Sequence, residues 1–164
     1  MARCLIIGCG CRARTLGGEL LARGHAVRGT TRDPSRAGEI EAAGIEAVVG
    51  DPDRVATLTA ALDHVSVVCI LLGSASGDAD ALAALHASRL AMLLHRMVDT
   101  TVRGVVYEAV GRVGPEWLSA GAEQVRSACE DARIPYALLD TDPSEHRAWL
   151  EAAIDAVERV LTAR

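Results

Sequence analysis

The chain has 164 residues, half of them hydrophobic, and a formal net charge of −5. This size and hydrophobicity predict a single folded domain over residues 1–164, and the acidic balance, with arginines scattered along the chain, argues against a nucleic-acid partner. No apolar run approaches the roughly 20 residues that cross a bilayer, so neither a membrane segment nor a signal peptide is expected. All 17 basic residues are arginines, which excludes chemistry that needs a lysine, such as Schiff-base formation.

The chain begins with the order strand, glycine-rich turn, helix and strand. Residues 3–7 form a short apolar run, typical of a buried parallel strand, which leads into the turn Gly8–Ala13 (GCGCRA). A helical pattern, a turn at Gly24-His25 and a second strand over Ala26–Thr30 follow. This order is the context that a dinucleotide-binding fingerprint requires.

Each small residue of this turn has a physical reason to be small. Gly8 allows the tight turn off the strand, and Gly10 lets the backbone approach a pyrophosphate without a Cβ in the way. Ala13, in the place of the third glycine, is small enough for close packing of helix and strand. The start of the helix then offers free N–H groups and a positive dipole end to phosphates.

Strand-like and helix-like segments alternate along the rest of the chain. The predicted strands are Cys4–Ile7, Ala26–Thr30, Glu46–Val49, Val65–Leu72, Gly104–Tyr107 and Tyr136–Leu139. The predicted helices are Arg12–Arg23, Ser35–Ala43, Arg54–Leu62, Ala79–Val98, Pro115–Ala132 and Pro143–Ala163. This alternation predicts an α/β protein of three layers (α/β/α), a doubly wound parallel six-stranded sheet of the Rossmann type with strand order 3-2-1-4-5-6.

In such a sheet a ligand binds outside the carboxyl ends of the strands, where the strand order reverses. The candidate cofactor-binding residues follow the first four predicted strands at this edge. They are Gly8, Cys9, Gly10, Cys11, Arg12, Thr31, Arg32, Asp51, Leu72 and Gly73.

The residues at the end of the second strand favour NADP over NAD. NAD-binding versions of the fold hold the ribose with an acidic residue about 20 residues beyond the glycines, and here Thr31 and Arg32 stand at that place. Arg32 can pair with the additional phosphate of NADP, and Arg12 is a second residue that can reach it. The alternative is NAD with Asp33 as the ribose ligand, although Asp33 precedes a proline and suits a helix cap.

Several of these segments resemble extended and atypical short-chain dehydrogenases/reductases, a group that includes nucleotide-sugar epimerases and NmrA-like proteins. The similar segments are Ile6–Gly10, Leu21–Arg32, Val48–Asp51 and Gly104–Tyr107. The resemblance implies a Rossmann core that binds NAD(P) and places Asp51 near the adenine. It also leads us to expect that the chain lacks the C-terminal substrate domain of the extended members.

The chain departs from this family where the family has its catalytic residues. Members follow the fifth strand with serines, and Glu108–Val110 stands there instead. Members also use a Tyr-x-x-x-Lys pair, but Gly111 follows Tyr107 at that spacing and the chain has no lysine. We therefore predict an NADP(H)-binding sensor, regulator or accessory subunit that lacks the family's proton-transfer residues.

Two alternatives stay open, one of which is a Rossmann scaffold that has lost its ligand. The other is an NADPH-dependent oxidoreductase that acts on a small molecule with an unusual proton donor. Tyr107 is the weak candidate, with a pKa expected near ~10 because it has no cationic neighbour. Glu108, Asp140 and Asp142 are expected to form an acidic rim at the same edge that could replace it.

Five cysteines give an odd count, and two of them fall in predicted core strands. Reduced thiols in a cytoplasmic protein fit this better than a disulfide framework. Cys9 and Cys11 lack a second pair at metal-ligand spacing, so no metal site is expected. Their place at the start of a helix should lower their thiol pKa, which leaves a redox-sensing role open.

The later helices carry more apolar surface than one sheet face can cover. Leu82–Val98, Pro115–Ala132 and Pro143–Ala163 are rich in Ala, Leu and Val, and the last two each contain a tryptophan. Closed two-fold dimers are the commonest oligomers, so we expect a homodimer formed by helices on a face of the sheet. A partner protein that completes the site remains an alternative.

Overall fold

A computed structural model describes residues 1–163; residue 164, the last of the predicted domain, lies outside the described residues. Its sheet has six parallel strands in the order β3-β2-β1-β4-β5-β6, which confirms the predicted Rossmann topology. The strands are β1 (Arg3–Ile7), β2 (Ala26–Thr31), β3 (Glu46–Val49), β4 (Val67–Ile70), β5 (Val105–Glu108) and β6 (Tyr136–Leu139).

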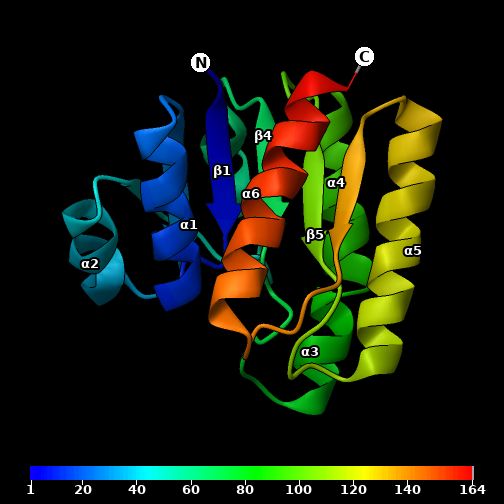
Figure 1. The fold of residues 1–164 in the computed structure, drawn as a ribbon. Helices are drawn as coiled ribbons and strands as arrows, with labels where there is room; N and C mark the ends of the chain where they lie inside the picture. The colour runs from blue at the N-terminus through cyan, green and yellow to red at the C-terminus, as the bar shows by residue number, and fades with distance from the viewer. Residues whose placement is uncertain (164) are drawn as a thin grey trace.

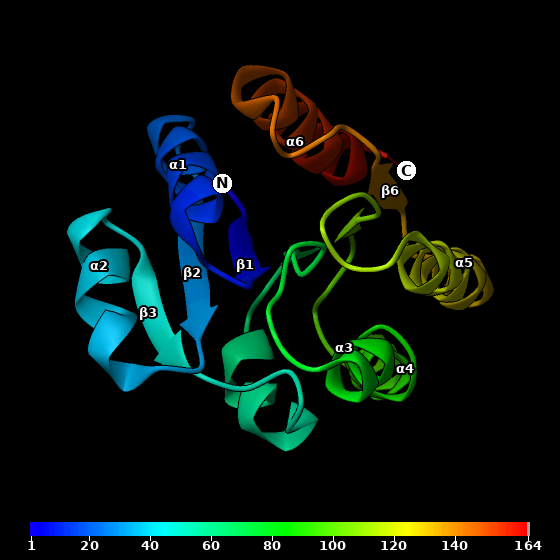
Figure 2. The same cartoon turned by 90° about the horizontal axis from the view of Figure 1, so that it is seen from below.

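Helices cover both faces of this sheet (Figures 1 and 2). The α-helices are α1 (Cys11–Ala22), α2 (Ala37–Ala42), α3 (Ala79–Leu85), α4 (Ser88–Val98), α5 (Pro115–Ala132) and α6 (His146–Thr162), and the 3-10 helices are η1 (Pro34–Arg36), η2 (Val55–Leu58) and η3 (Ala60–Leu62). One face packs against α1, α2 and α6, and the other packs against η2, η3, α4 and α5. None of the helices within residues 1–163 is both long and apolar enough to cross a membrane.

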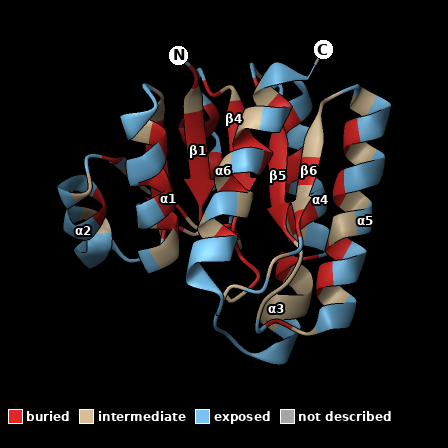
Figure 3. Ribbon diagram, in the orientation of Figure 1, coloured by how far each residue is buried: buried red, intermediate tan, exposed pale blue. Residues whose placement is uncertain are grey.

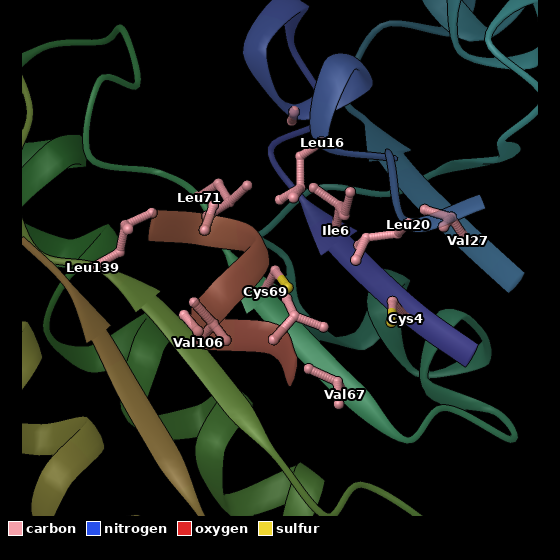
Figure 4. Packing of buried hydrophobic residues seen from close by; sticks show 14 of the residues in the cluster. Cys4, Ile6, Leu16, Leu20, Val27, Val67, Cys69, Leu71, Val106 and Leu139 are labelled. Atoms are coloured by element: carbon pink, nitrogen blue, oxygen red, sulfur yellow. The ribbon is translucent and has the colours of Figure 1, made fainter. Parts of the chain in front are cut away.

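The two faces form separate hydrophobic clusters, because side chains of a strand alternate between its faces. In β1, Cys4 and Ile6 join the cluster under α1 and α6, whereas Leu5 and Ile7 join the cluster under α4 and α5. Figure 3 shows that the central strands are buried, and Figure 4 shows Ile6 together with Leu16 of α1 in the first cluster. This burial on both sides explains why the central strands read as continuous apolar runs.

The long helix predicted over residues 79–98 is wrong, because the chain breaks it into α3 and α4. His86 ends α3, and Ala87 leaves the helical conformation with φ −123° and ψ −98°. The His86 ring is buried between Tyr107 and the backbone of Leu72. Anchoring this ring in the core turns the chain and separates the two helices.

Other predicted boundaries are also corrected. The helix expected over 54–62 consists of the short 3-10 helices η2 and η3. The last helix begins at His146 rather than at Pro143, because the Asp142 side chain accepts the Ser144 N–H and holds a turn there. The strand expected over 65–72 is shorter, Val67–Ile70, so its last residues are free to form a loop at the edge where a ligand is expected.

Candidate functional site

The turn between β1 and α1 requires a glycine at its first position. Gly8 has φ +87°, and a Cβ there would lie 2.6 Å from the carbonyl oxygen of Leu71. Both the backbone conformation and the neighbouring strand therefore exclude a side chain. This turn is also hydrogen-bonded to the end of β2, where the Thr30 carbonyl accepts the Cys9 N–H at 3.2 Å.

Gly10, two residues later, has no such structural requirement. Its φ is −81°, which any residue adopts, it is exposed, and an added Cβ would have no atom within 4 Å. Gly10 caps α1, whose first turn has no acidic residue and no side-chain cap. The backbone N–H groups in the first turn of α1 therefore have no side-chain partner. These N–H groups and the open space over Gly10 fit the approach of an anionic group such as a pyrophosphate.

A cavity of about 280 Å³ adjoins this turn at the carboxyl edge of the sheet. Segments that follow β1, β2, β3 and β4 line it. Its lining residues are Gly8, Cys9, Gly10, Thr30, Thr31, Arg32, Arg36, Gly50, Pro52, Leu72, Ser74, Ala75, Ser76 and Leu85. The cavity thus lies where the strand order reverses, which is the place that the topology predicts for a ligand.

Six of the ten predicted residues line this cavity: Gly8, Cys9, Gly10, Thr31, Arg32 and Leu72. The other four, Cys11, Arg12, Asp51 and Gly73, belong to the same segments but are not among its lining residues. The carboxylate of Asp51 accepts the Asp53 N–H at 2.9 Å and so stabilises its own turn. Sequence reasoning missed Arg36, although its position four residues after Arg32 in a turn that opens with a proline was a usable signal.

Two arginines therefore line the part of the cavity that follows β2. The Arg32 side chain is half exposed and its Nη1 lies 4.0 Å from Asp53, while the Arg36 Nη2 lies 3.7 Å from Glu39. Such exposed pairs are weak, so both guanidinium groups can turn to another anion. Asp33, the alternative ribose ligand, accepts hydrogen bonds from the Ser35 hydroxyl and N–H, which lower its pKa and commit it to capping η1.

Arg12, which was expected to reach the same phosphate, has other partners in this structure. Its Nη1 lies 3.6 Å from the carboxylate of Glu108, and its guanidinium carbon lies 4.9 Å from the centre of the Trp149 ring. These contacts draw the side chain toward β5 and α6, away from the arginines after β2. These contacts form only in the tertiary structure, which brings α6 and the end of β5 next to the start of α1.

Tyr107 lies in the core rather than at the mouth of the site. It is fully buried, and its hydroxyl lies 2.7 Å from Nδ1 of His86. The other ring nitrogen of His86 faces the Leu72 carbonyl at 3.1 Å and must donate, so Nδ1 accepts from the tyrosine. Burial, with the charge of Glu108, raises the pKa of Tyr107 well above its ordinary value, so the expectation of a pKa near ~10 is wrong.

The predicted acidic rim does not form. Glu108 is fully buried inside the molecule. Asp140 is exposed, and the Asp142 carboxylate is engaged by the Ser144 N–H at 2.8 Å. The three carboxylates thus have separate environments and separate roles.

One cysteine of the glycine turn also differs from expectation. Cys9 is buried, and this burial raises the pKa of its thiol to about 11, the opposite of the predicted lowering. Cys11 is exposed at the first position of α1, and all five cysteines are free thiols. Within residues 1–163, no three His, Cys, Asp or Glu side chains come together as a metal site.

Comparison with known proteins identifies the family of this chain. The model of a family described as NAD(P)H-binding matches residues 9–135. The chain therefore belongs to this NAD(P)H-binding family. No curated protein matches the chain.

Several solved structures share the fold. A short-chain dehydrogenase/reductase superfamily protein from Agrobacterium tumefaciens with bound NAD is 21% identical, with a TM-score of 0.69 over 83% of this chain and 48% of that one. UDP-glucuronic acid 4-epimerase from Bacillus cereus in complex with NAD is 14% identical (TM-score 0.65; 83% and 55%). Triphenylmethane reductase from Citrobacter sp. with NADP(H) is 19% identical (TM-score 0.62; 84% and 49%). The chain thus spans about half the length of these structures.

Proposed function

We propose that this protein binds NADP(H) and acts as a cofactor-dependent sensor, regulator or accessory subunit. The proposal depends on one observation: a single cavity adjoins both the start of α1, which has no side-chain cap, and two arginines that follow β2. Gly10 and the first turn of α1 would hold the pyrophosphate. Arg32, Arg36 and Thr31 would hold the phosphate that distinguishes NADP from NAD. Such a cofactor can supply or accept a hydride when a reaction partner is present.

The positions of the candidate proton donors support a binding role over catalysis. The Tyr107 hydroxyl is buried and donates to His86. Glu108 is also buried, and its carboxylate accepts a hydrogen bond from Trp149 of α6. Ala109 and Val110 follow them and carry no group that could transfer a proton. An NADPH-dependent oxidoreductase, the second candidate, would need its donor from substrate, water or another chain.

Calorimetric titration with NADPH and NADH tests the proposal. We expect NADPH to bind more tightly than NADH, and we expect no consumption of NADPH across a panel of carbonyl substrates. Equal affinity for the two cofactors would exclude the NADP assignment, and lack of binding by either would exclude the site. Turnover that is lost in Tyr107→Phe would show that the chain is an oxidoreductase.

We also propose that the protein is a cytoplasmic homodimer. Its five free cysteines suit a reducing compartment. The apolar stripe of α6 is buried within its own chain, so it is α4 that presents the exposed side chains Met92 and Val98. A groove of about 500 Å³ between α4 and α5 lies beside them, and a second copy related by two-fold symmetry could cover both helices.

Light scattering at micromolar concentration is expected to give about 34 kDa, twice the chain mass of 17.2 kDa. Val98→Asp should produce a monomer, because a charge would be buried in the interface. Val49→Asp is the matched control, since Val49 lies on the edge strand β3 and is also 52% exposed. A monomeric wild-type protein, or a dimer that both variants leave intact, would contradict this interface.

A further inference from the structure

One buried carboxylate links two segments beside the cavity, the start of α1 and the loop after β4, to α6. Glu108, the last residue of β5, has no exposed surface. One of its carboxylate oxygens accepts the Gly73 N–H at 2.9 Å, and the other accepts the Trp149 indole N–H at 2.9 Å. Arg12 of α1 places a guanidinium nitrogen 3.6 Å from the second oxygen. The carboxylate thus contacts α1, the loop after β4, and α6.

The loop after β4 packs against the segment after β5 with no room for side chains between them. A Cβ on Gly73 would lie 2.8 Å from the Glu108 carboxylate, and a Cβ on Gly111 would overlap the backbone of Gly73. The Gly73 carbonyl also accepts the Val113 N–H at 2.9 Å. Leu72 and Ser74, on either side of Gly73, line the cofactor cavity. The bond from Glu108 to Gly73 therefore helps to hold this wall of the cavity, together with the bond from the Val113 N–H.

The same carboxylate holds the start of α1. Arg12 lies in the first turn of this helix, and it rests on the Trp149 ring while it pairs with Glu108. The N–H groups of this turn are those proposed to hold the pyrophosphate. Glu108 thus contacts both the helix start and the loop after β4, which lie on opposite sides of the β1–β4 boundary.

A carboxylate at this position is costly for the fold alone. Burial raises the pKa of Glu108, although Arg12 and the hydrogen bonds from Gly73 and Trp149 oppose this rise. An apolar side chain in such a place is often as stable as a buried ion pair or more so. The carboxylate therefore suits a positioning role better than a role in stability.

We propose that Glu108 is a positioning residue, which holds the loop after β4 and the start of α1 at the distance that a dinucleotide requires. This inference rests on the proposed cofactor function. It does not itself contact the cofactor, because it is enclosed by protein. Its effect should be confined to the pyrophosphate and nicotinamide part of the ligand. The adenosine part depends on the residues after β2 and β3.

The test compares NADPH with adenosine 2′-monophosphate, a fragment that keeps the phosphate proposed to contact Arg32 and Arg36 but lacks the pyrophosphate and the nicotinamide half. In Glu108→Gln, one amide oxygen cannot serve both N–H donors, and Arg12 loses its anion. We expect NADPH affinity to fall at least about fivefold while fragment affinity stays within about twofold of wild type.

Glu123→Gln is the matched control, because it makes the same substitution at an exposed carboxylate of α5 that pairs with Arg126 and does not line the cavity. It should leave NADPH affinity within about twofold. If Glu108→Gln does not fold, Arg12→Met, on a partly exposed side chain, should give the same selective loss of NADPH. Equal losses for NADPH and the fragment, or for Glu108→Gln and Glu123→Gln, would overturn the inference. Wild-type protein that binds neither ligand would instead overturn the proposed function.

Discussion

Replacing Arg32 and Arg36 together by alanine is expected to weaken NADPH binding about 100-fold and to leave NADH binding within about twofold. Each arginine can donate charge-assisted hydrogen bonds to the additional phosphate of NADP, and such bonds contribute roughly 1.5–3 kcal/mol each. Because the Arg32 side chain is 53% exposed, its contribution should lie at the lower end of this range. Together the two arginines should contribute about 3 kcal/mol to the binding free energy, which corresponds to the expected loss of affinity. Calorimetry with both cofactors measures it.

The control replaces Arg147 and Arg159 together by alanine, which removes the same two charges from exposed side chains of α6. Arg147 pairs with Glu151 and Arg159 pairs with Asp155, and neither arginine is a lining residue of the cavity. This variant should leave the affinity for both cofactors unchanged. If the variant of the two cavity arginines loses affinity for NADH and NADPH equally, those arginines serve a part that both cofactors share, and the preference for NADP is wrong.

Gly10→Val should lower the affinity for either cofactor at least about 30-fold while the protein remains folded. The side chain would fill the open space over Gly10, through which the pyrophosphate must approach the start of α1. The fold itself tolerates the change, because Gly10 has φ −81° and a Cβ there meets nothing within 4 Å. Valine is a poorer helix cap than glycine, so the free energy of unfolding should fall by about 1 kcal/mol. Thermal unfolding and calorimetry on the same sample separate the two effects.

Gly18→Val is the matched control on the same helix. Gly18 is exposed, and its added Cβ also meets nothing within 4 Å, but it does not line the cavity. This variant should bind NADPH as the wild type does and should be no less stable, since glycine is the poorer residue inside a helix. A Gly10→Val protein that binds NADPH normally would falsify the placement of the pyrophosphate at this turn.

The sequence alone was sufficient for the architecture and for the edge of the sheet at which the cavity lies. Apolar runs that alternate with helical periods predict a parallel sheet, and the right-handed connection between parallel strands leaves few strand orders. Gly8 could be assigned to a tight turn because its reason is local, a backbone conformation with positive φ. The residues after β1 and β2 could be placed together because the carboxyl ends of parallel strands share one edge.

Tertiary structure decided where the side chains at that edge point and what they contact. Arg12 is next to the glycines in sequence, yet it turns to Glu108 and Trp149, which lie far along the chain. Tyr107 was predicted to end its strand, but β5 continues to Glu108 and the Tyr107 hydroxyl is enclosed by His86, which also breaks the helix predicted around it. Local periodicity determines the position of a residue along an element. Its direction, burial and pKa depend on elements distant in sequence, because charges and hydrogen bonds are satisfied only by the groups that the packing brings near.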